Sequence, residues 1–308
     1  MEKLYDLIII GGGPSGMTAG IYAGRGGYKT IIIEKLGTGG QMMLTDIIDN
    51  FPGFPDGITG YELQDKMHRQ VKKFGSEIVY DEIIKISKED NIFKVESKNS
   101  IYRSLAIILA LGAKHKPLNV KGEKEFLSKG VSYCATCDGP FFRGKSIAVI
   151  GGGDTALTEA IFLSKFAKKV FIVHRRDRFR AVQSLVNSAK KITNIEFVFN
   201  SVVQEIKGEE FVKSIILKEN DNIKELPING VFILVGLEPN TDFIDLPILD
   251  ENRYIITDEK MMTPIKGIFA CGDVRANSFR QIVTACGDGA LAYHYACEYI
   301  DEIKGNKY

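Results

Sequence analysis

The chain has 308 residues, which at about 150 residues per domain predicts two domains. It carries 40 Lys and Arg against 39 Asp and Glu, so its formal charge of +1 creates no global field that would favour nucleic acid or an anionic membrane. Its longest apolar run, 105–110, is far shorter than the roughly 20 residues that span a bilayer, and its first residues do not resemble a signal peptide. We therefore expect a cytoplasmic protein with no membrane and no nucleic-acid partner.

Two stretches 140 residues apart, 6–33 and 146–173, follow the same plan. Each contains a short β-branched strand, a glycine-rich turn, a helix and a second apolar strand, which is typical of a parallel α/β unit. The expected strands are 7–10, 30–33, 146–150 and 170–173, and the expected helices are 17–24 and 157–166. The segments 78–86 with 92–95 and 195–206 with 211–217 alternate, and each pair of segments predicts a hairpin or short meander. Apolar strands at 107–111 and 231–235 then close the two halves.

Polar links that contain glycine and proline lie at 112–117 and 236–241. Residues 244–308 contain no third complete unit, so we expect them to return to the first domain. The predicted domains are thus 1–115 with 244–308, and 116–243 inserted between them. The predicted fold class is α/β, with two Rossmann-like, three-layer ββα dinucleotide-binding domains.

The first glycine turn carries the spacing that binds a dinucleotide. Gly11 permits the turn, Gly13 lets the backbone approach a pyrophosphate, and Gly16 permits close packing of helix on strand. The start of the helix offers N–H groups to the phosphates. Glu34, 18 residues past Gly16, could hold a ribose 2′-hydroxyl, which predicts an unphosphorylated adenosine such as that of FAD.

The second turn, Gly151, Gly153 and Ala156, differs at the equivalent position. Eighteen residues past Ala156 stands His174, and Arg175, Arg176 and Arg180 follow it. Guanidinium groups bind a phosphate bidentately, so this site should prefer NADPH to NADH. A solvated basic face is the alternative.

A third cofactor signal lies near the C-terminus. An apolar segment delivers Asp273 beside Gly272, where its carboxylate could accept hydrogen bonds from the ribityl chain of a flavin. Arg280 and Gln281 open the last helix, whose N-terminal dipole could stabilise a reduced flavin ring.

The pair Cys134 and Cys137 indicates redox or metal chemistry in a chain without an export signal. Zinc would need two more ligands, and the sequence offers no second C-x-x-C or His pair, so no metal is expected. Two cysteines at this spacing can close a small, easily reduced ring. Asp138 could exchange a proton with a thiolate or serve as a turn residue. The other cysteines, Cys271, Cys286 and Cys297, are expected to be buried thiols.

The segments CATCDG at 134–139, HRRDRFRA at 174–181 and GIFACGDV at 267–274 closely resemble the bacterial-type, low-molecular-weight thioredoxin reductases. The resemblance implies a homodimer that passes electrons from NADPH through FAD to the cysteine pair and on to thioredoxin. It implies that Cys137 is the cysteine near the flavin, Cys134 attacks the thioredoxin disulfide and Asp138 is the general acid. Links near 117 and 239 should act as hinges for an alternating rotation, because NADPH and the disulfide share one domain.

The resemblance adds Gly39, Gly40, Gln41 and Asn50 to the flavin contacts. The predicted FAD site comprises Gly11, Gly13, Pro14, Ser15, Gly16, Glu34, Lys35, Gly39, Gly40, Gln41, Asn50, Gly112, Gly272, Asp273, Arg280, Gln281 and Ile282. The predicted NADPH site comprises Gly151, Gly153, Asp154, Thr155, Ala156, His174, Arg175, Arg176, Arg180 and Gly236. Two departures from the family pattern, Cys271 and 287–290, are expected to lie off the electron path.

Other functions compete with this interpretation. A reductase fed by ferredoxin would have an eroded second turn, whereas the glycines and arginines of this turn are intact. A thiol oxidase that passes electrons to oxygen is a further enzyme alternative. A nucleotide-sensing or zinc-binding regulator without catalysis is the alternative from another class.

Overall fold

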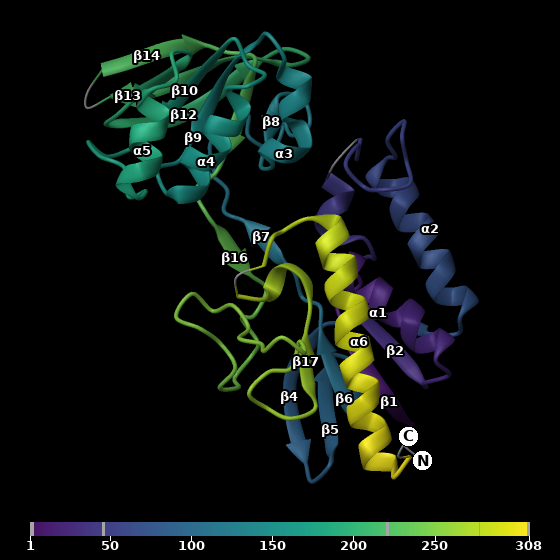
Figure 1. The fold of residues 1–308 in the computed structure, drawn as a ribbon. Helices are drawn as coiled ribbons and strands as arrows, with labels where there is room; N and C mark the ends of the chain where they lie inside the picture. Colours follow the sequence, from purple (N-terminus) through teal and green to yellow (C-terminus); the bar gives the residue numbers. More distant parts are fainter. Residues whose placement is uncertain (1–2, 45–46, 220–221, 277, 307–308) are drawn as a thin grey trace. The chain divides into compact units, whose positions relative to one another are not determined.

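A computed structural model of the chain describes residues 3–44, 47–219, 222–276 and 278–306 (Figure 1). The chain divides into two compact units. Unit 1 is Met1–Lys114 with Glu238–Tyr308, and unit 2 is His115–Leu237, inserted between these two parts. The crossings lie at 114/115 and 237/238, compared with predicted domain ends at 115/116 and 243/244. The connecting strands β7 (Ala113–His115) and β16 (Leu237–Pro239) pair with each other.

Unit 1 is built on one sheet with strand order β3-β2-β1-β6-β5-β4, in which β17 also pairs with β6. The strands are β1 (Leu4–Ile10), β2 (Thr30–Glu34), β3 (Glu77–Tyr80), β4 (Ile83–Glu89), β5 (Ile92–Ser97), β6 (Ile101–Leu109) and β17 (Ile268–Ala270). Strands β3, β2, β1, β6 and β17 run parallel, and β4 and β5 are antiparallel. The runs of isoleucine in β1 and β2 are buried because both faces of this sheet are covered.

Three helices cover one face of the unit 1 sheet: α1 (Pro14–Arg25), α2 (Gly60–Lys73) and α6 (Ile282–Lys304). Figure 1 shows α1 and α6 side by side. Leu7 and Ile9 of β1 pack into the cluster that contains these helices, whereas Ile8 and Ile10 pack with β4, β5 and residues of 244–274. The alternation of β1 therefore builds two cores from one strand.

The predicted pairing of 78–86 with 92–95 is confirmed for β4 and β5, which are antiparallel. The first part of this segment instead forms a separate strand, β3, which is parallel to β2. Asp81 explains the corner. Its buried carboxylate accepts hydrogen bonds from the N–H of Glu82, the hydroxyl of Ser97 and the amide of Asn99. The segment 195–206 is likewise divided, at Asn200, which adopts a left-handed φ of 51°.

Unit 2 contains three layers. Its parallel sheet has the order β11-β10-β9-β15-β8, and a separate antiparallel sheet has the order β12-β13-β14. The strands are β8 (Val131–Ser132), β9 (Ser146–Ile150), β10 (Lys169–Val173), β11 (Ile195–Val198), β12 (Ser201–Gly208), β13 (Val212–Glu219), β14 (Asn222–Pro227) and β15 (Gly230–Ile233). The helices are α3 (Ala135–Asp138), α4 (Asp154–Leu163) and α5 (Gln183–Lys190).

The core of unit 2 separates these layers. Ala148 and Ile150 pack toward the antiparallel sheet, and Ile147 and Val149 pack toward α3 and α4. The predicted α/β fold class is confirmed. Short 3₁₀ helices occur at η1 (Gly40–Leu44), η2 (Gly139–Phe142) and η3 (Gly272–Val274).

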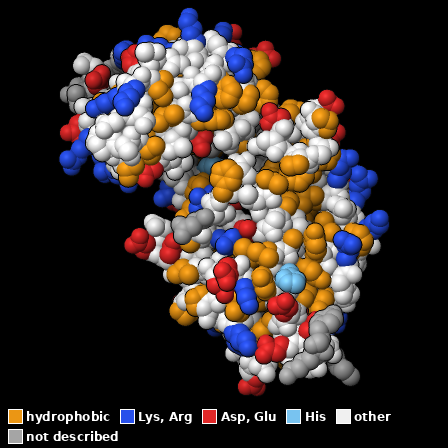
Figure 2. Space-filling model, viewed as in Figure 1, with side chains coloured by type: hydrophobic (Ala, Val, Ile, Leu, Met, Phe, Trp, Pro, Cys, Tyr) orange, Lys and Arg blue, Asp and Glu red, His pale blue; other side chains and the backbone are white. Residues whose placement is uncertain are grey.

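The surface carries charges of both signs. Figure 2 shows Lys and Arg interspersed with Asp and Glu over the visible face, in keeping with the formal charge of +1. Within the described ranges, no helix combines the length and the apolar character that crossing a bilayer requires.

Two glycines of α6 should respond oppositely to alanine. A Cβ on Gly289 would lie 2.2 Å from the Ser15 carbonyl oxygen, whereas a Cβ on Gly287 would have no neighbour within 4 Å. We expect Gly289→Ala to lower the free energy of unfolding by about 2–3 kcal/mol because it overpacks the contact between α1 and α6. We expect Gly287→Ala to raise it by about 0.5–1 kcal/mol because alanine favours a helix interior. Urea denaturation measures both values, and equal shifts for the two variants would contradict this packing.

Candidate functional site

The carboxyl ends of four parallel strands meet at one edge of the unit 1 sheet. Ile10 pairs with Ile33 of β2 and with Leu109 of β6, and Leu109 also pairs with Ala270 of β17. The predicted flavin residues Gly11, Glu34, Gly112 and Gly272 follow these ends within a few residues. Ligands of open α/β sheets bind at this edge.

The turn between β1 and α1 depends on glycine for two close approaches. A Cβ on Gly11, whose φ is +106°, would lie 2.2 Å from the Ala110 carbonyl oxygen, and one on Gly16 would lie 1.9 Å from the Gly11 oxygen. Gly13 is the N-cap of α1, no side chain caps the helix, and nothing lies within 4 Å of the Cβ position of Gly13. The first helical N–H groups, in the turn that holds Pro14 and Ser15, therefore face open space that a pyrophosphate would fill.

Glu34 is fixed at the end of β2. Its carboxylate accepts hydrogen bonds from the N–H of Gly12 at 2.6 Å and from that of Leu36 at 3.1 Å. A bound ribose hydroxyl would donate to the same carboxylate that already accepts from the N–H of Gly12. The Lys35 ammonium pairs instead with Glu82, at 2.8 Å.

The segment after β2 returns to the glycine turn. Gly39 donates its N–H to the Gly12 carbonyl at 2.8 Å, and the Cβ position of Gly40 lies 3.5 Å from the Cα of Gly13. Both glycines have positive φ, 117° and 57°, which explains the residue type. Gln41 follows in η1, with its side chain exposed.

Two predicted flavin residues that are 231 positions apart contact each other. The Asn50 amide donates to the Gln281 Oε1 at 3.1 Å. Gln281 is the N-cap of α6, which begins at Ile282. The preceding Arg280 lies with its guanidinium carbon 4.8 Å from the centre of the Tyr254 ring, and its buried Nε has no hydrogen-bond partner among the described residues. An unpartnered buried donor is the kind of group that a polar ligand satisfies.

Asp273 lies in η3, behind the positive φ of Gly272. Burial raises the pKa of its carboxyl, the guanidinium of Arg280 opposes this, and the charge of Asp288 adds to it. Asp288, which the sequence did not assign to the flavin site, contacts this turn: its Oδ2 accepts from the N–H of Gly272 at 3.1 Å and from Arg275 Nη1 at 2.7 Å. The only sequence signal for this role was an acidic residue within a glycine-rich stretch of helix.

Unit 2 repeats the design at the carboxyl edge of its own parallel sheet. Ile150 pairs with Val173 and with Ile233, so the glycine turn, His174 and Gly236 all follow neighbouring strand ends. Gly153 caps α4 with no side-chain hydrogen bond and with nothing within 4 Å of its Cβ position. The turn is completed by Ala156, which is fully buried, and by Thr155, which is exposed.

His174 is buried against the glycine turn, because a Cβ on Gly152 would lie 2.3 Å from its Nδ1. Its Nε2 has no hydrogen-bond partner among the described residues. Burial lowers the pKa of the imidazole, and the charges of the neighbouring arginines lower it further. The side chains of Arg175, Arg176 and Arg180 are exposed just beyond the end of β10.

The segment that carries Arg180 is tied to the glycine turn. The N–H of Arg180 donates to the Gly152 carbonyl at 2.7 Å, and the N–H of Val182 donates to the Asp154 Oδ1 at 2.8 Å. The Asp154 side chain thus holds this segment, a role that spacing could not reveal.

Cys134 and Cys137 form a disulfide, with their Cα atoms 5.3 Å apart. Both are partly exposed at the start of α3. The N–H of Cys137 donates to the Cys134 sulfur at 3.2 Å, a hydrogen bond that would stabilise a Cys134 thiolate after reduction. Asp138 follows directly and donates its N–H to the Cys134 carbonyl at 3.1 Å.

A buried acid supports the disulfide segment. Glu123 accepts hydrogen bonds from the Tyr133 hydroxyl at 2.6 Å and from three consecutive N–H groups, at Leu118, Asn119 and Val120. Tyr133 directly precedes Cys134 and stacks on His115, with ring centres 5.1 Å apart. Sequence reasoning missed both Glu123 and Tyr133.

The remaining cysteines are free thiols. Cys271 and Cys297 are buried, as predicted, and burial raises the pKa of each to about 12. Cys286 is only partly buried. Among the described residues, no three His, Cys, Asp or Glu side chains form a group that could hold a metal ion.

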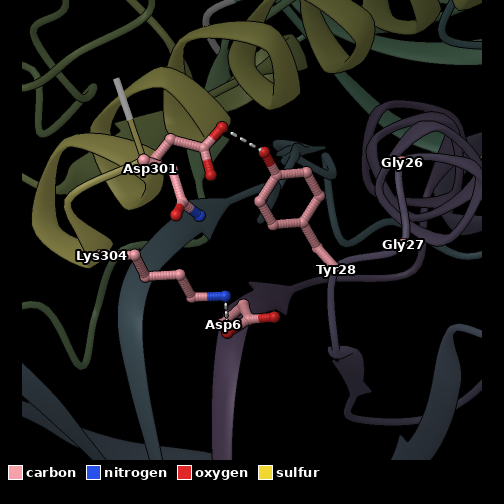
Figure 3. Close-up of a pocket in the computed structure, with 7 residues that line it drawn as sticks. Asp6, Gly26, Gly27, Tyr28, Asp301 and Lys304 are labelled. Atoms are coloured by element: carbon pink, nitrogen blue, oxygen red, sulfur yellow. Dashed lines mark hydrogen bonds and ion pairs between the residues drawn. The ribbon is translucent and has the colours of Figure 1, made fainter. Parts of the chain in front are cut away.

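A cavity of about 370 Å³ lies elsewhere in unit 1, lined by Asp6, Gly26, Gly27, Tyr28, Asp301, Lys304 and Asn306 (Figure 3). Its carboxylates are already engaged: Asp6 with Lys304 at 2.8 Å, and Asp301 with the Tyr28 hydroxyl at 2.7 Å. None of its lining residues belongs to the predicted sites. We therefore do not assign it to the reaction.

Known proteins share this arrangement. Residues 5–289 match the family model for pyridine nucleotide-disulphide oxidoreductases. The thioredoxin reductase of Listeria innocua is 47% identical over 307 residues, which cover 98% of this chain and 96% of that protein. The crystal structure of the Streptococcus pyogenes thioredoxin reductase matches with a TM-score of 0.94 at 43% identity, covering 98% of this chain and 100% of that one. The Lactococcus lactis thioredoxin reductase in its FR conformation matches with 0.68 at 44% identity, covering 97% and 99%.

The two nucleotide-binding turns and the disulfide define a two-domain α/β oxidoreductase. The chain belongs to the pyridine nucleotide-disulphide oxidoreductase family and, within it, to the bacterial-type thioredoxin reductases. This membership confirms the resemblance read from the motifs, and it implies a flavin and a nicotinamide nucleotide as cofactors.

Acid should destabilise the fold through His174. The unfolded imidazole binds a proton as the pH falls through its ordinary pKa of 6.5, but the folded one does so only at lower pH. The free energy of unfolding should therefore fall with pH below 6.5, until the folded state is also protonated. We expect the free energy of unfolding of His174→Gln to depend less steeply on pH in this range. Part of the pH dependence will remain, because burial also lowers the pKa of His68.

Urea denaturation at a series of pH values measures this slope. His294→Gln is the matched control, because this histidine is exposed on α6. Equal slopes for His174→Gln and the wild-type protein would show that His174 does not carry the effect.

Proposed function

We propose that the protein is an NADPH-dependent, FAD-containing thioredoxin-disulfide reductase that works as a homodimer. The observation that carries the proposal is the partly exposed disulfide Cys134–Cys137, in the same unit as one nucleotide-binding turn and in a chain with a second such turn. Relatives that span almost the whole chain are thioredoxin reductases. Thioredoxin, a protein disulfide, is the proposed substrate.

FAD fits unit 1. The uncapped N-terminus of α1 could bind the pyrophosphate, and the Glu34 carboxylate, fixed by its hydrogen bond from Gly12, could bind a ribose hydroxyl. The Arg280 Nε has no partner among the described residues and could donate to an acceptor atom of FAD. Asp273 would accept from the ribityl hydroxyls. When bound, FAD supplies a carrier that takes two electrons from a reduced nicotinamide and returns them to a disulfide.

NADPH fits unit 2. The open N-terminus of α4 suits the pyrophosphate, and the exposed guanidinium groups of Arg175, Arg176 and Arg180 lie just beyond β10. A 2′-phosphate would find bidentate partners there, whereas a carboxylate such as Glu34 would repel it. The intact turn and arginines are also the reason to prefer NADPH over ferredoxin as the electron source.

The cysteine pair performs the exchange with thioredoxin. Once both cysteines are reduced, the Cys134 thiolate attacks a sulfur of the thioredoxin disulfide and forms a mixed disulfide, and one thioredoxin thiolate leaves. Cys137 then attacks Cys134, which closes the internal disulfide and releases dithiol thioredoxin. Each of the two thioredoxin thiolates takes up one proton: one comes from the Cys137 thiol, which loses its proton when it attacks, and Asp138 would give the other, so two electrons and two protons reach the substrate.

The disulfide and the NADPH site share unit 2, while FAD is assigned to unit 1, so turnover needs alternating positions. The paired strands β7 and β16 are the proposed hinge. Two solved relatives with 43% and 44% identity have TM-scores of 0.94 and 0.68. Such a spread at constant identity is expected if members of the family place two similar units differently.

The compartment and the alternatives follow from the same chemistry. A reductase that keeps a partner thiol reduced is expected in the cytoplasm. A thiol oxidase would pass its electrons to oxygen, so oxygen consumption without thioredoxin would favour that alternative. Homodimerisation is testable by sedimentation of the purified protein.

Cys134→Ser should separate the two half-reactions. Under anaerobic conditions NADPH should still bleach the flavin absorbance of this variant, because neither cofactor site contains Cys134. Reduction of added thioredoxin should be abolished, because no attacking thiolate remains. Cys297→Ser is the control, since this thiol is buried and should be dispensable. A colourless wild-type protein, or thioredoxin reduction by Cys134→Ser, would refute the proposed function.

Arg175→Ala should discriminate between the nucleotides. We expect the Michaelis constant for NADPH to rise roughly tenfold or more, the effect of losing about 1.4 kcal/mol or more of binding. The constant for NADH should change little, because NADH lacks the 2′-phosphate. Arg178→Ala is the matched control, being exposed in the same segment. Equal changes for both nucleotides would mean that Arg175 belongs to a solvated basic face.

A further inference from the structure

The turn that presents Asp273 is held from both ends by one side chain of α6. Asp288 accepts from the N–H of Gly272, directly before Asp273, at 3.1 Å. The same oxygen, Oδ2, accepts from the guanidinium of Arg275, two residues after Asp273, at 2.7 Å. The carboxylate thus brackets the turn, with Asp273 between its two contacts.

This bracket lies within the protein. The side chains of Arg275 and Asp288 are only 16% and 17% exposed, so the ion pair is shielded from water far more than the surface pairs of the chain. Arg275 is also anchored on its other side, where its Nε donates to the Thr257 hydroxyl at 2.9 Å. Removal of one partner would leave a partly buried charge unpaired, which costs far more than loss of an exposed pair.

The helix that carries Asp288 also contacts other predicted flavin residues. Gln281 caps this helix and contacts Asn50, and Gly289, next to Asp288, packs on Ser15 of α1. Asp288 therefore links α6 to η3 through a charged group, one residue from the glycine that packs on α1. A neutral residue at this position could accept from Gly272 but could not neutralise Arg275.

We propose that Asp288, paired with Arg275, is a positioning residue for flavin binding, acting through the orientation of the Gly272–Asp273 turn. This inference rests on the proposed function, in which Asp273 binds the ribityl chain of FAD. It assigns a role to the stretch 287–290 that sequence comparison alone placed off the electron path.

The test uses holoenzyme, with FAD dissociation on dilution followed by the rise of free-flavin fluorescence. We expect Asp288→Asn and Arg275→Gln each to raise the Kd for FAD about tenfold or more, because each leaves a shielded charge unpaired. The double variant R275Q/D288N should raise it less than either single variant, since two amides can again form a hydrogen bond. Glu298→Gln, which removes an exposed carboxylate from the same helix, should leave the Kd unchanged.

Two further measurements separate positioning from a merely structural role. The visible circular dichroism of the bound flavin should change in Asp288→Asn and stay as in wild type in Glu298→Gln. Kd values are compared only among variants that remain folded by far-ultraviolet circular dichroism. If Asp288→Asn does not fold, the Kd for FAD of Arg275→Gln is compared with that of the double variant instead.

The outcomes are distinct. A wild-type protein without flavin would remove the proposed function, and this inference with it. A yellow wild-type protein whose single variants keep its Kd and its flavin spectrum would overturn only the role of Asp288. The role of Asp288 would also be overturned if the double variant lost at least as much FAD binding free energy as the two single variants lose together, because the two charges would then act independently.

Discussion

Close approach of the backbone at the ends of parallel strands is the constraint on which the rest of the structure depends. Gly16 lets α1 pack against the Gly11 carbonyl, and Gly289 lets α6 pack against Ser15. A side chain at Gly16 would push α1 away from the end of β1, and one at Gly289 would push α6 away from α1. No side chain caps α1, so its first N–H groups remain available, and the packing of unit 1 and the phosphate site that we propose there have one origin. Unit 2 reaches the same result with Ala156 in place of the third glycine.

The sequence predicted the elements that depend on local pattern. The strands β1, β2, β9 and β10 are short β-branched runs, and the length, the β-branched content and the neighbouring glycines of such runs favour buried strands over helices. Each glycine turn was predictable from three positions at the spacing typical of a dinucleotide-binding turn. The pairing of β4 with β5 was predicted, but the separation of β3 from β4 was not, because Asp81 forms the corner through partners at Ser97 and Asn99, which no local pattern contains.

For the candidate site, the sequence indicated which residues to consider more clearly than it indicated what each of them does. Spacing identified Glu34 and His174 as equivalent positions, but only the fold shows that one carboxylate binds its own turn and that the other side chain is buried beneath its turn. Glu123 and Asp288 gave almost no sequence signal, because each acts on partners that the tertiary fold brings to it. Buried carboxylates that accept several hydrogen bonds are the residues that single-sequence reasoning is least able to find.

The location of the disulfide has a mechanistic consequence. Tyr133 connects Cys134 to Glu123, and Glu123 binds the backbone that follows β7, so the segment before the disulfide is fixed to the segment that enters unit 2. Unit 2 can therefore carry its cysteine pair as a rigid body, with no need for the pair to move within the unit. If an external flavin must meet both this disulfide and a nucleotide held near Arg175, the motion has to occur at the two chain crossings. We propose a rotation of one unit against the other because the paired strands β7 and β16 at these crossings form a ribbon that can twist.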